Sequence, residues 1–522
     1  MAARQRLARC QRPTYGVSGR HMRTALEDRT VTGQNHGDSA LNFATTKELT
    51  AALIGKKISA LELADHFIAR IEALDDKLNA VVVRDFERAR AAAKAADAAL
   101  ARGEGRPLLG IPIVIKESFD VDGLPTTWGV PAFKEFVAKD DALMVARVRA
   151  AGAIILGKTN VPYVLGDWQS FNDIYGTTNN PWDLGRSPGG SSGGSSAALA
   201  AGFSPISLGS DIGGSLRVPA HFCGIYAHKP TLNLVPPRGH RLPGTVQRIS
   251  DLAVVGPMAR TAADLELLLD LTSGPDETRA GIAYRVALPK ARHTALKDFR
   301  VLVIDEHPLL PTDASVRAAL DRLAQQLLKA GAKVARQSPL LPDLAASARL
   351  YMRLLMAALS ERWPEETYQQ AQTTAAALHV DDHSLPAERW RGAVMSHRQW
   401  AAADMGRITL QQQWTELFRE FDVVLCPPLS TTAFPHNHTP VPERTIEIEG
   451  KSFAFFDLLV WPEIATTPGL PATAAPIGLT GTGLPVGVQI VGPYLEDRTP
   501  LAFAALIERA FGGFVAPSGY AD

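Results

Sequence analysis

The sequence has few cysteines, no net charge and no long hydrophobic segment. Its three cysteines, Cys10, Cys223 and Cys426, are too few and too widely spaced for a disulfide framework or a cysteine zinc site, and they predict a reducing, cytoplasmic compartment. The 54 basic residues balance the 54 acidic ones, so no overall charge attracts nucleic acid or an anionic membrane. Because no apolar run approaches the ~20 residues of a membrane-spanning helix, we expect no span.

The N-terminal segment differs in composition from the rest of the chain. It is rich in arginine and has no apolar h-region, so it is not a secretory signal. Because residues 1–20 contain no acidic residue, a mitochondrial transit peptide stays an alternative. The composition favours a disordered extension over residues 1–40, with Met22 as a second candidate for the start of translation. The arginines of this segment include Arg4, Arg6, Arg9, Arg12, Arg20 and Arg23.

Strand and helix patterns alternate along the chain, which indicates an α/β fold. Ser59, followed three residues later by Glu62, forms a capping-box pattern, and the apolar residues behind it share one helical face. Short β-branched runs such as "GIPIVIKES", "AIILG", "RVLVID", "FDVVLCP" and "PVGVQIVG" predict buried strands. Helical patterns cover residues 85–102, 141–151, 314–331 and most of 343–420.

No linker rich in proline and glycine divides the sequence, and no internal repeat is present. We therefore expect one large domain over residues 41–522, within which residues 275–420 form a helical elaboration.

The stretch "GGSSGGSS" at residues 189–196 has three physical interpretations. A flexible linker is one, but "AALAAG" continues it directly into a helix of small residues. A phosphate-binding loop of the form G-x-x-x-x-G-K-[ST] needs a lysine, which this stretch lacks. Gly189, Ser191 and Gly193 match the G-x-S-x-G nucleophile elbow, but the polar segment "NNPWDLGRSP" before them does not form the required strand. We therefore treat the elbow match as accidental.

The next loop, "LGSDIGGSLR", supplies a better nucleophile. The adjacent Gly213 and Gly214 let successive backbone N–H groups converge on one point, where they hold an anion. Ser215 can then attack a carbonyl while these N–H groups receive the oxyanion. Serine needs a base, and Lys116 ends a strand that the pattern predicts to be buried. Burial disfavours the charged form of lysine, so Lys116 is the candidate base.

Residues 185–231 resemble the signature region of the amidase signature family. The resemblance lies in the Gly-Gly-Ser-Ser-Gly-Gly loop, the Gly-Ser-Asp-x-Gly-Gly-Ser-x-Arg loop and the closing Cys-Gly…Lys-Pro-Thr. It extends to "GIPIVIKES" and "GKTNVP" upstream and to "GLPVGVQIVGP" downstream, and it covers the chain from about residue 45 to its end. It implies the fold of that family, a single large α/β domain with a central mixed β-sheet covered by helices on both faces.

The resemblance also implies a Ser–cis-Ser–Lys catalytic triad. The nucleophile corresponds to Ser215, the bridging serine to Ser191 and the base to Lys116. In the family the bridging serine follows a cis peptide bond, which here is the bond between Gly190 and Ser191. The glycine-serine stretch is then a rigid loop that aims one hydroxyl, and no metal or cofactor is implied.

The remaining site residues surround this triad. Ser192, which lies beside the bridging serine, is expected to be a hydrogen-bond support rather than a direct participant. Asp211 and Arg217 are expected to frame the loop through an ion pair or hydrogen bonds rather than to contact substrate. The oxyanion hole is assigned to the backbone N–H groups of Ile212, Gly213, Gly214 and Ser215.

Other reactive residue types have simpler explanations. Cys223 lies in apolar "HFCGIY" and is expected to be a buried structural thiol. Nothing in the sequence places an acid behind His221 or His228, and the "HNH" at 436–438 offers two metal ligands without a third. Trp168, Gln169 and Trp461 are candidates for the pocket wall, although aromatic residues are usually core residues.

The predicted activity is hydrolysis of a carboxylic acid amide to an acid and ammonia or an amine. Apolar segments such as "WGVPAF", "YMRLLMAAL" and "FAFFDLLVW" favour a small-molecule substrate with a hydrophobic or aryl group. Two alternatives within the same chemistry stay open, a carbamate or ester hydrolase and the glutaminase subunit of an aminoacyl-tRNA amidotransferase. We expect no nucleic-acid partner, and a homodimer stays open.

Overall fold

The computed structural model describes residues 39–246 and 251–522, and its central feature is an 11-stranded sheet. The predicted extension over residues 1–40 lies almost wholly outside the described residues. From edge to edge, the strands are β1 (Val81–Arg84), β3 (Ile154–Thr159), β2 (Pro112–Lys116), β6 (Ile206–Asp211), β8 (Val254–Ala259), β7 (Tyr226–Lys229), β14 (Ala472–Leu479), β15 (Pro485–Val491), β11 (Val423–Cys426), β9 (Arg300–Val303) and β10 (Lys333–Ala335).

The sheet is mixed, with two groups of parallel strands separated by antiparallel pairs, and with the edge strand β1 antiparallel to β3. Strand β2 pairs in parallel with β3 and β6, and β9 pairs in parallel with β10 and β11. The strands β8, β7, β14 and β15 between these groups are all joined by antiparallel pairing. The predicted α/β fold with a mixed sheet is therefore confirmed.

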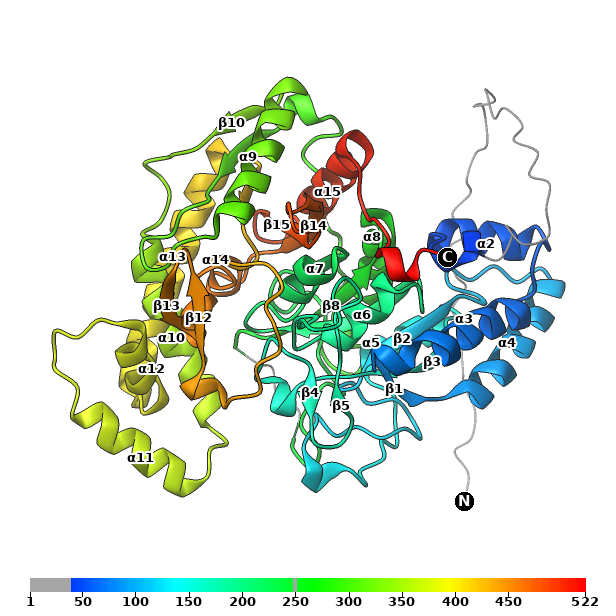
Figure 1. Cartoon of the computed structure of the whole chain (residues 1–522), viewed down its shortest axis with the longest axis horizontal. Coiled ribbons are helices and arrows are strands. Elements are labelled where there is room, and N and C mark those ends of the chain that lie inside the picture. The colour runs from blue at the N-terminus through cyan, green and yellow to red at the C-terminus, as the bar shows by residue number, and fades with distance from the viewer. Residues whose placement is uncertain (1–38, 247–250) are drawn as a thin grey trace, which may run out of the picture. The chain divides into compact units, whose positions relative to one another are not determined.

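Helices cover both faces of this sheet (Figure 1). They are α1 (Ser39–Asn42), α2 (Thr46–Ile54), α3 (Ala60–Leu74), α4 (Phe86–Ala101), α5 (Leu143–Ala150), α6 (Gly193–Ala200), α7 (Arg217–Cys223), α8 (Ala262–Thr272), α9 (Ala314–Lys329), α10 (Leu344–Ser360), α11 (Glu365–Ala376), α12 (Leu385–Ala393), α13 (His397–Glu420), α14 (Glu463–Thr466) and α15 (Arg498–Phe511). Two small hairpins lie outside this sheet, β4 (Phe171–Asn172) with β5 (Gly176–Thr177) and β12 (Thr445–Ile448) with β13 (Lys451–Ala454).

Helix α3 shows how local sequence sets an element boundary. The Ser59 hydroxyl accepts the Glu62 N–H at 3.1 Å, and the Glu62 carboxylate accepts the Ser59 N–H at 2.8 Å. This capping box satisfies N–H groups that the first turn leaves without partners. The predicted apolar face, which includes Phe67 and Ile71, is buried in the main core.

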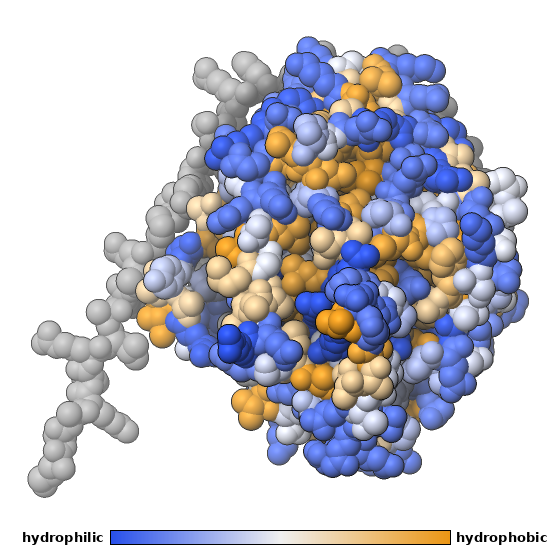
Figure 2. All heavy atoms as spheres, turned by 90° about the vertical axis from the view of Figure 1, so that its left-hand side faces the viewer, coloured by the Kyte–Doolittle hydropathy of each residue, from blue (hydrophilic) through white to orange (hydrophobic). Residues whose placement is uncertain are grey.

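The predicted helical region at 343–420 forms α10 to α13, which pack into a second apolar core around Trp414 and Leu355. Seen from the side that carries α11 to α13, hydrophobic side chains lie in the middle of the surface with hydrophilic ones around them (Figure 2). Residues 275–420 also supply β9 and β10, so this part of the chain extends the sheet as well as covering it. The domain boundaries proposed from the sequence stay a prediction.

The membrane prediction concerns the helices alone. Within residues 39–246 and 251–522, none of them is both long enough and apolar enough to cross a bilayer.

Candidate active site

The site lies where two neighbouring parallel strands end. Strand β2 ends at Lys116 and β6 ends at Asp211, and the two strands pair in parallel register. Because parallel strands bring their carboxyl ends to the same edge, Lys116 and the last residues of β6 meet there. Both glycine-rich loops lie at this edge, since one follows β6 and the other contacts Lys116.

The Lys116 amine is surrounded by serine hydroxyls. Its Nζ lies 2.7 Å from Ser191 Oγ, 3.0 Å from Ser192 Oγ and 2.9 Å from Ser210 Oγ. The side chain is fully buried, and burial lowers its pKa well below the ordinary value of 10.5, although the charge of Asp211 opposes this shift. A neutral amine at hydrogen-bond distance from a hydroxyl is the arrangement that a general base requires.

The glycine-serine stretch is a buried, ordered loop. The peptide bond between Gly190 and Ser191 is cis, as the family resemblance implies. Gly189 has φ +85°, and a Cβ on Gly190 would overlap the carbonyl oxygen of Asp167, so both positions require glycine. No strand is described between Thr177, where β5 ends, and Ser191, which agrees with rejecting the elbow interpretation. Because every residue from 187 to 200 is buried, the linker interpretation is wrong.

The loop that carries Ser215 is closed by the Asp211 carboxylate. Oδ1 accepts the Gly214 N–H at 2.9 Å and Oδ2 accepts the Leu216 N–H at 3.0 Å. The Gly214 N–H is therefore already engaged, whereas the N–H groups of Ile212, Gly213 and Ser215 donate to no acceptor in the described part of the chain. The Ser192 N–H donates to the Ser215 carbonyl at 3.2 Å, which joins the two loops.

Ser191 and Ser215 line the same cavity, which has a volume of about 760 Å³. Within residues 39–246 and 251–522, no hydrogen bond joins their two hydroxyls directly. The cavity walls are largely apolar and include Trp128, Leu355 and Phe455. This volume lies inside the ~300–1,000 Å³ range of small-molecule sites.

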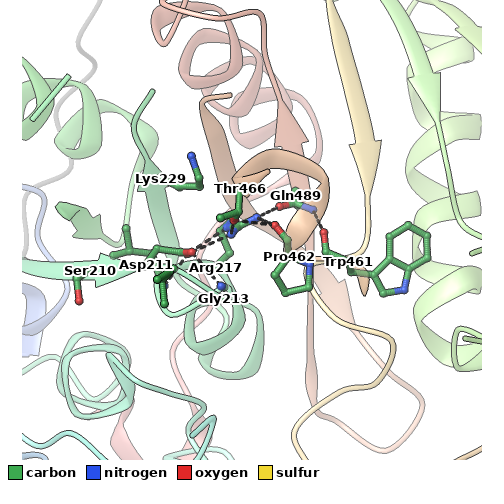
Figure 3. A network of polar contacts seen from close by, with 12 residues as sticks. Ser210, Asp211, Gly213, Arg217, Lys229, Trp461, Pro462, Thr466 and Gln489 are labelled. Carbon is green, nitrogen blue, oxygen red and sulfur yellow. Dashed lines mark hydrogen bonds and ion pairs between the residues drawn. The ribbon is translucent and has the colours of Figure 1, made fainter. Parts of the chain in front are cut away.

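Arg217 forms the centre of a buried polar network (Figure 3). Its Nε and Nη2 donate to the two Asp211 oxygens at 3.0 and 2.8 Å. Its remaining donors reach the Pro462 carbonyl, the Thr466 hydroxyl and the Gln489 side-chain oxygen. All five guanidinium donors are thus used inside the protein, so Arg217 has none left for a substrate.

The same network sets the charge of the loop. Burial alone raises the pKa of Asp211, but the charge and hydrogen bonds of Arg217 outweigh it and lower that pKa to about 2. Asp211 is therefore ionised at every ordinary pH, and its carboxylate continues to accept the Gly214 N–H.

Comparison with known protein families shows to which family this fold belongs. The family model described as Amidase matches residues 62–501, which is most of the chain. The chain belongs to the amidase signature family. It is accordingly a hydrolase that acts on amide C–N bonds.

Relatives of this amidase differ in what their names say they act on. Fatty-acid amide hydrolase 2-A of Danio rerio is 31% identical, and the match covers 93% of each chain. A glutamyl-tRNA(Gln) amidotransferase subunit of Psychrobacter cryohalolentis is 30% identical over 90% of this chain and 97% of that protein. The solved structure of 6-aminohexanoate cyclic dimer hydrolase complexed with substrate superposes with a TM-score of 0.72, at 27% identity over 92% of this chain and 100% of that one.

The other candidate residues of the amidase have structural explanations. Cys223 is buried, its pKa is raised by burial, and its thiol donates to the Pro188 carbonyl at 3.4 Å. The His221 Nδ1 accepts the Gly487 N–H at 2.7 Å, and burial lowers the pKa of His221 to about 4. His228 does have an acid behind it, since its Nε2 lies 3.2 Å from Asp497 Oδ1. However, its Nδ1 faces the Thr473 hydroxyl at 2.9 Å, so no serine nucleophile is paired with it.

The structure also places the residues that were candidates for metal binding and for the pocket wall. Among the described residues of the amidase, no group of three or more His, Cys, Asp or Glu side chains could hold a metal ion. Trp168 lines the cavity, while the Gln169 amide hydrogen-bonds both backbone groups of Asn437 and Trp461 is buried beside His307.

Two residues of the site escaped the sequence reasoning. Ser210 touches the Lys116 amine, and the signal for it was its place next to last on a strand beside that of Lys116. The Tyr351 hydroxyl donates to the Ile212 carbonyl at 2.7 Å across 139 residues of sequence. No local pattern could have found that contact.

Replacing Arg217 with methionine is expected to destabilise the amidase by about 3–5 kcal/mol, because the Asp211 charge stays buried without a partner. Urea unfolding at neutral pH measures this loss. A matched control is Arg419→Met, which removes an exposed ion pair with Glu416 and should cost about 0–1 kcal/mol. Equal losses in the two variants would show that the network contributes no special stability.

Proposed function

We propose that this amidase hydrolyses a small-molecule amide with a hydrophobic acyl or aryl group through an acyl-enzyme on Ser215. The observation that carries the proposal is the position of Ser191. Its hydroxyl lies 2.7 Å from a buried lysine amine and lines the same apolar cavity as Ser215. A base, a bridging hydroxyl and a nucleophile thus meet at a site suited to an uncharged substrate.

The first half of the reaction forms the acyl-enzyme. The Ser215 oxygen attacks the amide carbon, its proton passes to Ser191, and the Ser191 proton passes to the neutral Lys116 amine. The substrate brings the Ser215 hydroxyl toward Ser191, since catalytic hydrogen bonds often form only in the substrate complex. The backbone N–H groups of Ile212, Gly213 and Ser215 are the available donors for the oxyanion. The C–N bond then breaks as the proton returns from Lys116 through Ser191 to the leaving nitrogen.

The second half regenerates the enzyme. Water attacks the ester carbon of the acyl-enzyme and gives its proton to Lys116 by the same hydroxyl path. The C–O bond to Ser215 breaks, the proton returns to the Ser215 oxygen, and the carboxylic acid leaves. Ser192 and Ser210 hold the Lys116 amine in line with Ser191 throughout.

The shape of the cavity supports an apolar substrate. Helix α10 contributes Leu355, Ala358 and Leu359 to one wall, and Phe455, Phe456 and Leu459 form part of another. Burial of apolar groups against such walls is worth roughly 25 cal/mol per Å² of surface removed from water. Hydrophobic or aryl amides are therefore expected to have higher kcat/KM than acetamide or glutamine.

Narrowing the cavity tests this substrate class. Ala358→Trp fills space at the wall and should lower kcat/KM for a long or aryl amide by about 10-fold or more, with a smaller effect on a short amide, because overpacking excludes the larger group. A panel of aliphatic and aryl amides measures this difference. The control is Ala346→Trp, an exposed position on the same helix, which should leave the substrate profile unchanged. Equal losses for short and long amides would contradict the proposal.

The similarity to a glutamyl-tRNA(Gln) amidotransferase subunit supports an alternative, in which this chain is a glutaminase subunit. The largely apolar wall favours an apolar amide over the charged amino-acid end of glutamine, although the charged residues Arg241, Glu361 and Arg362 also line the cavity. Glutamine hydrolysis at a kcat/KM above that of every apolar amide would reverse the choice. Esters and carbamates are expected to react by the same acyl-enzyme.

The proposed setting is the cytoplasm, and the oligomeric state is proposed to be a homodimer or a monomer. The free thiols of Cys223 and Cys426 support a reducing compartment. Light scattering on the purified protein distinguishes a dimer from a monomer.

A further inference from the structure

Two buried side chains hold successive carbonyl groups of the loop that carries the nucleophile. The Tyr351 hydroxyl donates to the Ile212 carbonyl at 2.7 Å, and the Trp168 indole N–H donates to the Gly213 carbonyl at 2.9 Å. Tyr351 comes from α10 and Trp168 from the segment before the glycine-serine loop. Both side chains are almost completely buried, with exposed fractions of 0% and 6%.

Each contact holds a carbonyl group, and it therefore also fixes the direction of the N–H group in the same peptide unit. In a trans peptide the C=O and the following N–H point in opposite directions. Since Tyr351 holds the Ile212 carbonyl, the Gly213 N–H points away from Tyr351 and stays available. Since Trp168 holds the Gly213 carbonyl, the Gly214 N–H points away from Trp168 and meets Asp211. The peptide unit between Gly213 and Gly214 is thus held at both ends.

The loop needs such contacts because of its own sequence. Gly213 and Gly214 have no Cβ to restrict them, and Gly214 adopts φ +89°. An oxyanion hole accelerates a reaction only when its donors already point at the developing charge. Burial raises the pKa of Tyr351, so its hydroxyl keeps the proton that it donates.

We propose that Tyr351 is a positioning residue that orients the Gly213 N–H, an oxyanion donor, through the Ile212 carbonyl. Trp168 acts on the next peptide unit, where it holds the Gly213 carbonyl and so directs the Gly214 N–H to Asp211. The inference rests on the proposed function, because it assigns these residues to the same acyl transfer. It also refines the predicted oxyanion hole, since the Gly214 N–H is bound by Asp211 and the N–H groups of Ile212, Gly213 and Ser215 stay available to the substrate.

Tyr351→Phe tests the proposal by removing one hydroxyl and keeping the ring. We expect kcat for an apolar amide to fall about 10-fold with KM changed less than about twofold, since a misdirected donor affects the transition state and not the bound substrate. The affinity for a trifluoromethyl ketone, which forms a tetrahedral adduct, should fall by the same factor. The matched control is Tyr226→Phe, a buried tyrosine whose hydroxyl has no partner in the described part of the chain.

The outcomes separate this inference from the proposed function. If Tyr351→Phe and Tyr226→Phe have equal kcat and equal affinity for the ketone, the positioning role is wrong. If Tyr351→Phe folds poorly, Trp168→Phe releases the neighbouring peptide unit instead. Because Trp168 also lines the cavity, this variant must lower the affinity for the ketone more than the affinity for the corresponding alcohol, which forms no adduct, for the role to stand. If the wild-type chain hydrolyses no amide and forms no ketone adduct, the proposed function fails before these variants are compared.

Discussion

Ser215→Ala is expected to lower kcat for the best amide substrate by about 10⁴- to 10⁶-fold, the largest effect of any single substitution in this chain. Alanine removes the atom that forms the acyl-enzyme, so only binding and the oxyanion donors remain. Single-turnover and steady-state hydrolysis assays measure the loss. The control is Ser196→Ala on α6, which removes another buried serine hydroxyl, one without a hydrogen-bond partner among the described residues, and should leave kcat within about twofold.

Mass spectrometry gives this prediction a second readout. Intact wild-type protein mixed with a slowly hydrolysed aryl amide or ester should gain the mass of the acyl group on the peptide that contains Ser215. The Ser215→Ala variant should gain none. Acylation of Cys223 or of another serine would contradict the assignment, as would wild-type turnover by Ser215→Ala.

Lys116→Ala is expected to lower kcat/KM by about 10²- to 10⁴-fold, the range of a general base. Because the neutral amine is the active form, wild-type activity is present above the pKa of Lys116 and is lost as the pH falls through it. Burial lowers the pKa of Lys116 well below 10.5, so activity should rise at a pH well below 10.5. The alanine variant has no amine to titrate and should lack this rise.

A second buried lysine supplies the control for the pH profile. Lys229 lies on β7, burial lowers its pKa to about 7, and its amine donates to the Leu470 carbonyl at 2.7 Å. The Lys229→Met variant, if folded at the assay temperature, should keep the acid limb of the wild-type profile. The assignment would be refuted if Lys229→Met lost the acid limb and Lys116→Ala kept it. Lys229 would then be the base in place of Lys116.

Local signals in the sequence identified most of the elements and the loops that matter. The Ser59 and Glu62 pair gave the start of α3, and β-branched runs gave β2, β3, β9, β11 and β15. The glycine-rich loops and Lys116 could be recognised because each depends on residues close together in sequence. The resemblance then joined them, and the structure places all three beside one another.

Long-range contacts could not be predicted in the same way. The order of β8, β7 and β14 in the sheet depends on pairing between segments far apart in the chain. The Tyr351 contact and the engagement of the Gly214 N–H by Asp211 depend on side-chain directions that periodicity does not encode. Composition also leaves open which amide fits, because the cavity wall is assembled from several separate segments.

The Arg217 network has a consequence for how the enzyme is made. Three of its acceptors, on Pro462, Thr466 and Gln489, lie 245 residues or more beyond the arginine in the chain. A nascent polypeptide still attached to the ribosome holds the nucleophile loop without them until translation has nearly ended. Arg217 therefore acquires its full set of acceptors only after β15, which carries Gln489, has been synthesised and has joined the sheet.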